Sequence, residues 1–484
     1  MLKSRWGQAL VTVFILRLGL VAIAQAFPEG GVLIDSRGYL EMASDIRVAG
    51  WAALGQGDLH WTPGYPAFLL LAETLTGTSL VGVGLVQLIL TGAAAILLWW
   101  IGARLGYRCV GIAAAWLYLL SPSTGLWSLT IMSESLFAFL LVLALAFLVL
   151  GIVDGRIAGW ALAGGTLAAA ALVRPIGLPL IAIWALAALT AGAPSRRRAS
   201  VGAATGVAVL LAASIAAVAP WVVRNWSVTG QPVFAEVPAD TLVSFNLAYV
   251  VAEAEGITRD EAAARLSAEV DSWEDGLEIV RRYPLIFVGQ QMEGFRRSLI
   301  GVESGVWARQ FGFGLERQGS LEVLSVLFGG DPWRALERLR ILMQDGQTAL
   351  LTVLSVVAVV YTGALYLLGV LGLGSVLRPG GPARAVFLVA GLTTVYLLLA
   401  PGAAGQARFR IPIEPYLALF AGAGCSVLIR RARTRNWFRR IAPEADADLA
   451  DRRPTASPTV PPGSERSSAR IGAPRDRRPR AAHV

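Results

Sequence analysis

DSRGYLEMASDIRVAGWAALGQGDLHWTPGYP occupies residues 35–66 and is the first polar interruption after the first apolar segment of the chain. Its first half is acidic and helix-forming, because Tyr39, Met42 and Ile46 recur at helical spacing on one side. Its second half, HWTPGYP at residues 60–66, is aromatic and punctuated by proline. The stretch predicts a helix followed by a turn-rich loop that the rest of the chain holds at a membrane surface.

The composition explains why a membrane is expected. The chain has 484 residues, of which 55% are hydrophobic and 15% charged, whereas about a quarter of the residues in soluble globular proteins are charged. The net charge of +9 lies mostly in short clusters beside apolar runs and in the tail, which is typical of a topology signal and not of nucleic-acid binding. Two distant cysteines, Cys109 and Cys425, exclude a disulfide framework and a metal knuckle.

Ten apolar runs are long enough to span a bilayer, which needs about 20 residues. They are residues 9–27, 80–103, 109–127, 134–151, 157–173, 176–192, 200–223, 347–377, 384–400 and 411–430. The first run resembles a cleavable signal peptide, but Arg17 interrupts it, so we expect it to be retained as a span. Run 64–72 is too short to span and predicts a re-entrant or interfacial helix. The sequence therefore predicts an all-α polytopic membrane protein with about 10 transmembrane helices.

The distribution of arginine indicates the orientation. With ten spans and the N-terminus inside, the arginine-bearing connections lie on the cytoplasmic side, as the positive-inside rule requires. A transmembrane module, 1–430, then has outer loops at 28–79 and 224–346, and a basic, disordered cytoplasmic tail occupies 431–484. This arrangement is typical of a multi-pass membrane protein with both termini on the cytoplasmic side.

The long outer loop contains a stretch of helical pattern at 259–283, with Thr258 as its N-cap. Apolar residues that include Ala262, Leu266 and Leu277 form a stripe along it. Two readings remain open. The helix lies on the membrane or caps a cavity, or it simply packs against its neighbours.

Carboxylates and arginines are the candidate chemical groups of the outer face. Asp35 opens the first-loop helix, where it acts either as an N-cap or as a general base at the edge of a lipid-walled cavity. Glu134 begins a span, where it binds substrate or complements the helix dipole. Arg408 and Arg410, in GQARFRIPIEP, carry planar guanidinium groups that suit phosphate oxygens, with pairing to Glu414 or to lipid head groups as the alternative.

The remaining candidates surround the same outer face. Arg224 and Asn225 lie in PWVVRNW, between Trp221 and Trp226, which are expected to anchor the chain at the membrane interface. Arg174 precedes a proline at a helix end. The chain has only two histidines, one of them His60, so it contains no histidine-rich metal site. No cofactor is assigned. A divalent cation held by Asp35, Glu134 and His60 is conceivable. No nucleotide-binding or hydrolase motif occurs, which argues against an ATP-driven pump.

Five motifs in this order resemble the GT-C glycosyltransferase superfamily, in particular bacterial relatives of protein O-mannosyltransferases and aminoarabinose transferases. They are DSRGY at 35–39, WTPGYP at 61–66, IMSESLF at 131–137, PWVVRN at 220–225 and RFRIPIEP at 408–415. The resemblance covers about residues 9–430. This sequence has a lone Glu134 where relatives carry an acidic pair, which argues against a metal site there.

The resemblance implies a hexosyl- or pentosyltransferase of the bacterial cytoplasmic (inner) membrane. It would move a sugar, with inversion, from a polyprenyl-phosphate donor to an extracytoplasmic lipid, glycan or protein acceptor of the cell envelope. Asp35 would be the catalytic base that deprotonates the acceptor. The expected substrate-binding residues are Tyr39, His60, Tyr65, Glu134, Arg224, Asn225, Arg408 and Arg410. A transporter or flippase of a lipid-linked sugar is the alternative, and a non-catalytic scaffold is a third reading. No internal repeat of the kind common in transporters is evident.

Overall fold

Helices make up all the regular structure that the computed structural model describes. The described residues are 5–50, 60–77, 79–190, 202–236, 241–270, 273–302, 304–313, 337, 340, 343–344, 346–378 and 382–434. The chain divides into a compact unit, Met1–Arg430, and the remainder, Arg431–Val484. The predicted disordered tail, 431–484, starts too early, because residues 431–434 are helical. Residues 435–484 lie outside the described part, as does segment 51–59 of the first loop.

The order of elements along the chain is as follows. The α-helices are α1 (Arg5–Leu18), α2 (Leu20–Ala26), α3 (Ile34–Ala49), α4 (Gly64–Thr76), α5 (Leu80–Arg104), α6 (Arg108–Leu120), α7 (Pro122–Trp127), α8 (Glu134–Asp154), α9 (Ile157–Val173), α10 (Leu178–Leu189), α11 (Ala203–Thr229), α13 (Ala248–Glu255), α14 (Arg259–Glu269), α15 (Trp273–Arg282), α16 (Pro284–Ile300), α17 (Ser304–Gln310), α20 (Gly346–Leu377), α21 (Pro382–Leu399) and α22 (Glu414–Thr434). Short 3₁₀ helices are η1 (Pro28–Gly31), η3 (Pro175–Gly177), η6 (Gly402–Ala404) and η7 (Ala407–Ile413), and η4 (Leu242–Leu247) is a π-helix.

The apolar helices confirm the predicted membrane protein. Within the described residues, six helical segments are long and apolar enough to cross a membrane: α5, α8, α11, α20, α21 and Ala407–Ala432, which contains α22. Four shorter apolar segments are Val11–Ala26, Arg108–Leu120, Ile157–Val173 and Pro175–Leu189. The six long segments match the predicted runs 80–103, 134–151, 200–223, 347–377, 384–400 and 411–430, because lipid imposes length and apolarity on each span separately. The other four runs form shorter helices, and runs 9–27 and 109–127 are each broken into two, at Gly19 and at Ser121.

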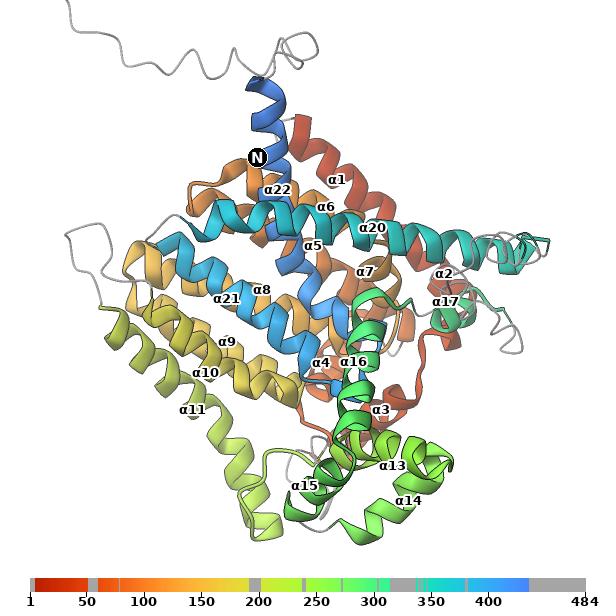
Figure 1. Cartoon of the computed structure of the whole chain (residues 1–484). Coiled ribbons are helices and arrows are strands. Elements are labelled where there is room, and N and C mark those ends of the chain that lie inside the picture. The colour runs from red at the N-terminus through yellow and green to blue at the C-terminus, as the bar shows by residue number, and fades with distance from the viewer. Residues whose placement is uncertain are drawn as a thin grey trace, which may run out of the picture. The chain divides into compact units, whose positions relative to one another are not determined.

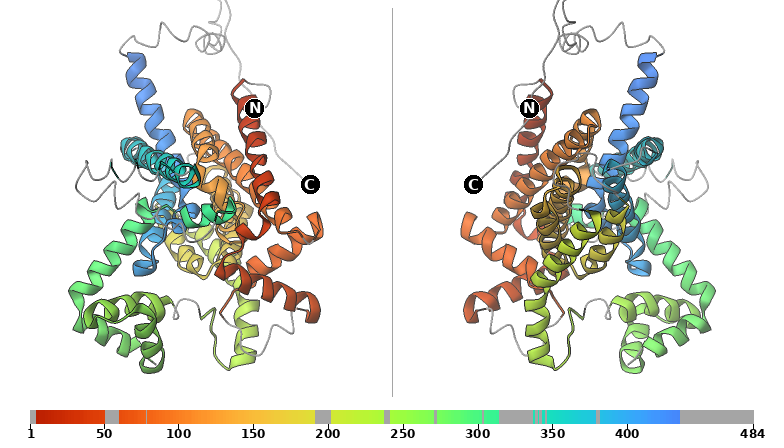
Figure 2. Two further views of the ribbon diagram at one scale, coloured as in Figure 1. Left: turned by 90° about the vertical axis from the view of Figure 1, so that its right-hand side faces the viewer. Right: turned by 90° about the vertical axis from the view of Figure 1, so that its left-hand side faces the viewer.

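Helix α8 lies at the centre of the bundle (Figure 1). It packs against α5 and α9; α9 packs in turn against α11, and α5 against α6. A hydrogen bond from Trp184 Nε1 to Thr393 Oγ1 (2.8 Å) joins α10 to α21. Figure 2 shows α13, α14 and α15 at the end of the unit that also holds α3, and the start of α1 at the opposite end. The first-loop helix and the long outer segment therefore lie at the same end of the bundle.

Helix α4 carries the PGYP half of the first loop. Its 13 residues extend only about 20 Å at 1.5 Å per residue, which is too short to cross a bilayer. It packs against α3, α5 and α9. The helix itself is confirmed, and its interfacial or re-entrant position stays a prediction.

Gly38 allows the two halves of the first loop to meet. A Cβ at this position would lie 2.3 Å from Nε1 of Trp61, so no other residue leaves room for the indole against α3. The buried face of α3 holds Tyr39, Met42 and Ile46, as the periodicity predicted. Met42 and Ile46 share a small core with Trp221 of α11, which packs there instead of serving simply as an interfacial anchor.

The predicted single helix over 259–283 is wrong. Helix α14 ends at Glu269, Val270 is extended (φ −104°, ψ 93°), and α15 starts at Trp273. Ala262 and Leu266 pack against α13 and η4 in a separate core, whereas Leu277, in the same predicted stripe, is 46% exposed. The break allows each short helix to pack separately on η4, which supports the packing interpretation for the first half of the stripe.

Thr258 begins α14 with a reciprocal capping box. Its Oγ1 accepts the Glu261 N–H (3.2 Å), and Glu261 Oε2 accepts the Thr258 N–H (2.8 Å) and hydroxyl (2.8 Å). These bonds from Thr258 hold the pKa of the Glu261 carboxyl below its usual value. The bonds to the carboxylate therefore stabilise α14 at neutral pH and are lost as the pH falls through that lowered pKa.

We expect Thr258→Ala to destabilise α14 by about 1 kcal/mol, because the helix loses its N-cap. Hydrogen exchange of the α14 amides should accelerate, and exchange in α8 should stay as in the unmodified protein. Ser267→Ala is the control, since Ser267 is an exposed residue of the same helix whose hydroxyl donates only to a local carbonyl. Equal protection of α14 in both variants would contradict the capping role.

Helix α16 connects the outer segment to the bundle. It contacts α13 and α15 as well as α20, α21, η6 and η7. Gly294 permits close contact with η6, because a Cβ there would lie 2.0 Å from the Gly402 carbonyl oxygen. The Tyr366 hydroxyl of α20 donates to the Leu299 carbonyl at the end of α16 (2.8 Å). The C-terminal end of α16 is therefore part of the bundle, although the sequence placed it in an outer loop.

Candidate functional site

An ion pair between Asp35 and Arg408 joins two of the motifs. Asp35 lies in the first turn of α3, and Arg408 lies in η7, more than 370 residues later. Arg408 Nη1 donates to Asp35 Oδ2 at 2.8 Å. The Asp35 side chain is 33% exposed, so the carboxylate is accessible to a substrate. The helix begins after Leu33, so Asp35 does not take the N-cap position and is available for another function.

A second ion pair lies next to the first. Arg174 follows the last residue of α9, where Pro175 prevents the helix from continuing. Its Nη1 lies 2.7 Å from Glu134 Oε1 and donates to Ser133 Oγ at 2.9 Å. Glu134 is 1% exposed. Its position at the start of α8 was predicted, but its carboxylate faces Arg174 and is closed to a substrate, so the expected direct substrate contact does not fit this geometry.

Phe409 lies between the two ion pairs. The Arg408 guanidinium carbon is 5.2 Å from the centroid of the Phe409 ring, and that of Arg174 is 5.7 Å from it. Both distances fall in the range of cation–π attraction. One aromatic ring thus holds two guanidinium groups near each other. We call Asp35, Glu134, Arg174, Arg408 and Phe409 the double-arginine site.

Aromatic side chains of the first loop form one border of this site. The Tyr39 hydroxyl lies 3.3 Å from Ser133 Oγ, which also binds Arg174. The Tyr39 ring contacts those of Trp61 and Tyr65, with centroids 4.5 and 4.8 Å apart. Burial raises the pKa of the Tyr39 phenol, although Arg174 acts in the opposite direction. Tyr39 therefore keeps its proton at neutral pH and orients Ser133.

Tyr65 and His60 differ in what they offer a substrate. Tyr65 is fully buried, and its hydroxyl donates to Gln87 Oε1 (3.1 Å), so it supports Tyr39 from behind. His60 is half-buried, and its ring lies edge-on to Trp61 with centroids 4.5 Å apart. Of the two residues, His60 is the one that a substrate can reach.

Arg410 does not join Arg408 in a phosphate clamp. It is 2% exposed, and its Nη1 donates to the carbonyls of Ser298, Leu299 and Gly301 at 3.0–3.3 Å. Its Nε lies 3.6 Å from Glu414 Oε1. Both arginines belong to η7, a helix with three residues per turn, so positions two apart point to different sides. The alternative pairing with Glu414 is the one that the structure shows.

Arg224 and Asn225 lie in α11, one turn after Trp221. The Arg224 guanidinium is stacked over Trp221 at 5.1 Å and donates to Asn225 Oδ1 at 3.0 Å. Asn225 is fully buried, and its Nδ2 donates to the Val233 carbonyl at 2.9 Å. The Asn225 amide therefore stabilises the chain that follows α11. Because the side chain is fully buried, a substrate cannot reach it.

The predicted cation ligands do not come together. Within the described residues, no group of three His, Cys, Asp or Glu side chains could hold a metal ion. Glu134 is occupied by Arg174, and Asp35 by Arg408. The divalent cation considered for Asp35, Glu134 and His60 therefore has no ligand set here.

Ser133 and Phe409 are site residues that the sequence did not single out, and Arg174 was noted without a partner. Each is adjacent to a predicted residue: Ser133 precedes Glu134, and Phe409 follows Arg408. The sequence signal for Arg174 is its position: it lies directly before Pro175, which ends a helix, on the outer side of the predicted topology. Only the packing of α8, α9 and η7 brings these residues together.

Comparison with known proteins gives similarity at the level of structure. No family model matches the chain, and no curated protein matches its sequence. The apo oligosaccharyltransferase of Archaeoglobus fulgidus aligns with 89% of this chain at 13% identity and a TM-score of 0.48. ArnT from Cupriavidus metallidurans bound to undecaprenyl phosphate aligns with 91% of this chain and 82% of its own, at 13% identity and a TM-score of 0.39.

At these identities and TM-scores the alignments assign neither a family nor an activity to this chain, so the GT-C resemblance stays a prediction from the motifs. The chain spans about half the length of the archaeal structures, 52% in the apo form. TM-scores below 0.5 assign no role to any residue.

Proposed function

We propose that the protein is a glycosyltransferase that moves a sugar from a polyprenyl-phosphate donor to an acceptor hydroxyl on the extracytoplasmic side of a bacterial cytoplasmic membrane, with inversion at the sugar carbon. The observation that carries the proposal is the 2.8 Å pair between Asp35 and Arg408. It combines an accessible carboxylate with a guanidinium group that can bind phosphate. The acceptor class, whether lipid, glycan or protein, is left to experiment.

In this proposal the donor phosphate competes with Asp35 for Arg408. Guanidinium groups bind phosphate through charge-assisted hydrogen bonds, and the second guanidinium, on Arg174, lies on the same Phe409 ring. When Arg408 turns to the phosphate, the Asp35 carboxylate loses its partner. It is then available to accept a proton.

The reaction needs one proton acceptor and one stabilised leaving group. Asp35 removes the proton of the acceptor hydroxyl while its oxygen attacks the sugar carbon from the face opposite the phosphate. The bond between that carbon and the phosphate oxygen breaks, and its electron pair leaves with the polyprenyl phosphate. Arg408 and Arg174 offset the charge that develops on the phosphate. Tyr39 and His60 border the sugar and acceptor.

Arg408→Gln is expected to weaken the binding of undecaprenyl phosphate about 10- to 100-fold, because a hydrogen bond to a charged group contributes roughly 1.5–3 kcal/mol. Titration of the purified protein in detergent, followed by tryptophan fluorescence, measures this loss. Arg47→Gln is the matched control: Arg47 is half-exposed at the other end of α3 and pairs with Glu73. Unchanged affinity in Arg408→Gln would remove Arg408 from the donor site.

The function itself is tested by mass spectrometry of envelope glycans and lipid-linked sugars from cells with and without the protein. A polyprenyl-phosphate sugar that accumulates while one glycan loses a residue supports the proposal and identifies donor and acceptor. A lipid-linked sugar stranded on the inner leaflet favours a flippase instead. No change in either pool favours a scaffold.

A further inference from the structure

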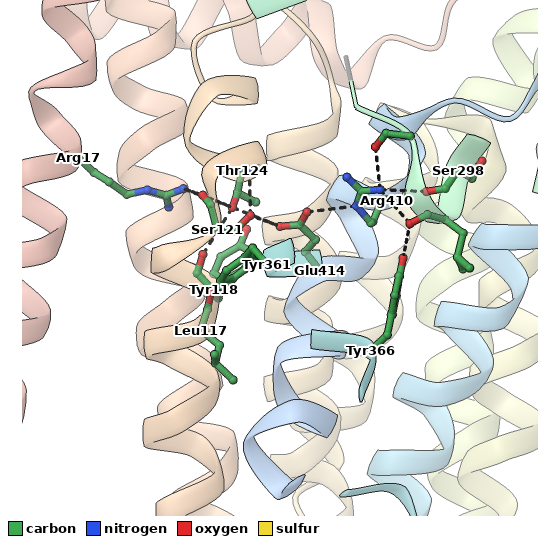
Figure 3. Close-up of polar contacts among 12 residues, drawn as sticks. Arg17, Leu117, Tyr118, Ser121, Thr124, Ser298, Tyr361, Tyr366, Arg410 and Glu414 are labelled. Carbon is green, nitrogen blue, oxygen red and sulfur yellow. Dashed lines mark hydrogen bonds and ion pairs between the residues drawn. The ribbon is translucent and has the colours of Figure 1, made fainter. Parts of the chain in front are cut away.

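A chain of buried polar contacts runs from Arg17 through Glu414 to Arg410 (Figure 3). It includes three charged side chains, Arg17, Glu414 and Arg410, and each is more than nine-tenths buried. Ionised groups inside an apolar bundle are costly, so those that occur are usually paired and serve a purpose. The chain lies next to η7, the element that carries Arg408.

At one end of this chain, Arg410 caps α16. The last carbonyls of an α-helix have no partner within the helix, and a basic side chain there also complements the negative end of the helix dipole. Arg410 donates to the carbonyls of Ser298 and Leu299 in the last turn of α16, and to that of Gly301 just beyond it. The Arg410 guanidinium thus fixes η7 to the end of α16.

At the centre of the chain, Glu414 fixes the other end of η7. It is the first residue of α22, where a carboxylate favours the positive end of the helix dipole. Its Oε1 faces Arg410 Nε at 3.6 Å, and its Oε2 accepts from Ser121 Oγ at 2.5 Å and Thr124 Oγ1 at 3.4 Å. Ser121 is the N-cap of α7, and Thr124 lies in the first turn of that helix. The carboxylate therefore connects η7 with α7.

Arg17 completes the chain on the side away from η7. Its Nη2 donates to the Ser121 carbonyl at 2.8 Å and to Thr124 Oγ1 at 3.3 Å. The same two residues bind Glu414, so the charge of Arg17 lies close to the carboxylate without touching η7. Arg17 thus offsets the Glu414 charge and leaves Arg410 free to cap α16.

We infer that Arg410 and Glu414 are positioning residues, which hold η7 between α16 and α7 so that Arg408 faces Asp35. The inference rests on the proposed function and extends it to two residues that touch no substrate. Arg408 lies two positions before Arg410 in a helix with three residues per turn, so fixing Arg410 on α16 sets the side on which Arg408 emerges. Loss of the brace turns Arg408 away from Asp35 and from the donor phosphate.

A double-mutant cycle tests this inference. Arg410→Gln is expected to weaken undecaprenyl phosphate binding on the order of 10- to 100-fold, because small displacements of a binding group cost that much. The double variant Arg408→Gln/Arg410→Gln should bind no more weakly than Arg408→Gln alone, because Arg410 acts through Arg408. Additive losses would overturn the inference. Arg410→Lys and Glu414→Asp keep the charges and should recover part of the affinity, whereas Glu414→Gln should not.

Hydrogen exchange separates this inference from the proposed function. The amides of residues 405–413 should exchange faster in Arg410→Gln and Glu414→Gln than in the unmodified protein, whether or not any ligand binds. Thr393→Val is the control, since it removes a buried hydrogen bond between α10 and α21 and should leave this segment protected. Unchanged exchange in the brace variants would overturn the inference. Failure of the unmodified protein to bind undecaprenyl phosphate would count against the proposed function alone.

Discussion

Asp35→Asn is expected to lower the rate of sugar transfer by about 10²- to 10⁴-fold, the range that a general base usually contributes. Asparagine has nearly the same shape, and its side-chain oxygen can still accept the hydrogen bond from Arg408. It cannot take the acceptor proton. The fold and the expression level should therefore persist while transfer is lost. Initial rates of the purified protein, with saturating lipid-linked donor, measure the effect.

The affinity for the lipid phosphate gives a second readout for the same variant. Removing the Asp35 charge removes one anion that competes for Arg408, so undecaprenyl phosphate should bind Asp35→Asn at least as tightly as it binds the unmodified protein. Asp45→Asn is the matched control, because Asp45 is an exposed residue of the same helix α3. Normal turnover in Asp35→Asn would end the assignment of Asp35 as the base.

Arg174→Gln is expected to destabilise the protein by about 3 kcal/mol, at the lower end of the cost of breaking a buried ion pair. The reason is the unequal burial of the partners. Glu134 is 1% exposed and Arg174 is 14% exposed, so removal of the arginine leaves a carboxylate that water cannot reach. The midpoint of thermal unfolding in detergent measures the change.

The converse variant serves as the control for this prediction. Glu134→Gln leaves a guanidinium that keeps its bond to Ser133 and some access to water, so the loss of stability should be smaller. The double variant Glu134→Gln/Arg174→Gln should be more stable than Arg174→Gln alone, because no buried charge then lacks a partner. Equal losses of stability in Arg174→Gln and Glu134→Gln would show that the unequal burial of the two partners does not determine the cost of breaking the pair.

The sequence alone predicts a structural feature correctly where the physical cause of that feature acts within one segment of the chain. Each membrane helix must be apolar over its own length, so all ten predicted runs lie in apolar helical segments, although runs 9–27 and 109–127 each form two helices. The same holds for the buried face of α3, with Tyr39, Met42 and Ile46, and for the Thr258 cap of α14. Asp35 and Arg408 were proposed for one site because both lie on the predicted outer face, and they are in contact.

Tertiary packing decided which charges meet. The sequence placed Arg408 and Arg410 together, but the 3₁₀ geometry of η7 turns Arg408 toward Asp35 and Arg410 toward the end of α16. Glu134 gained Arg174 as its partner because α8 packs against α9, a contact between helix ends that no local pattern encodes. Lipid acts on each helix separately and can be read from the sequence, whereas the pairing of charges depends on distances between helices, which only the folded chain determines.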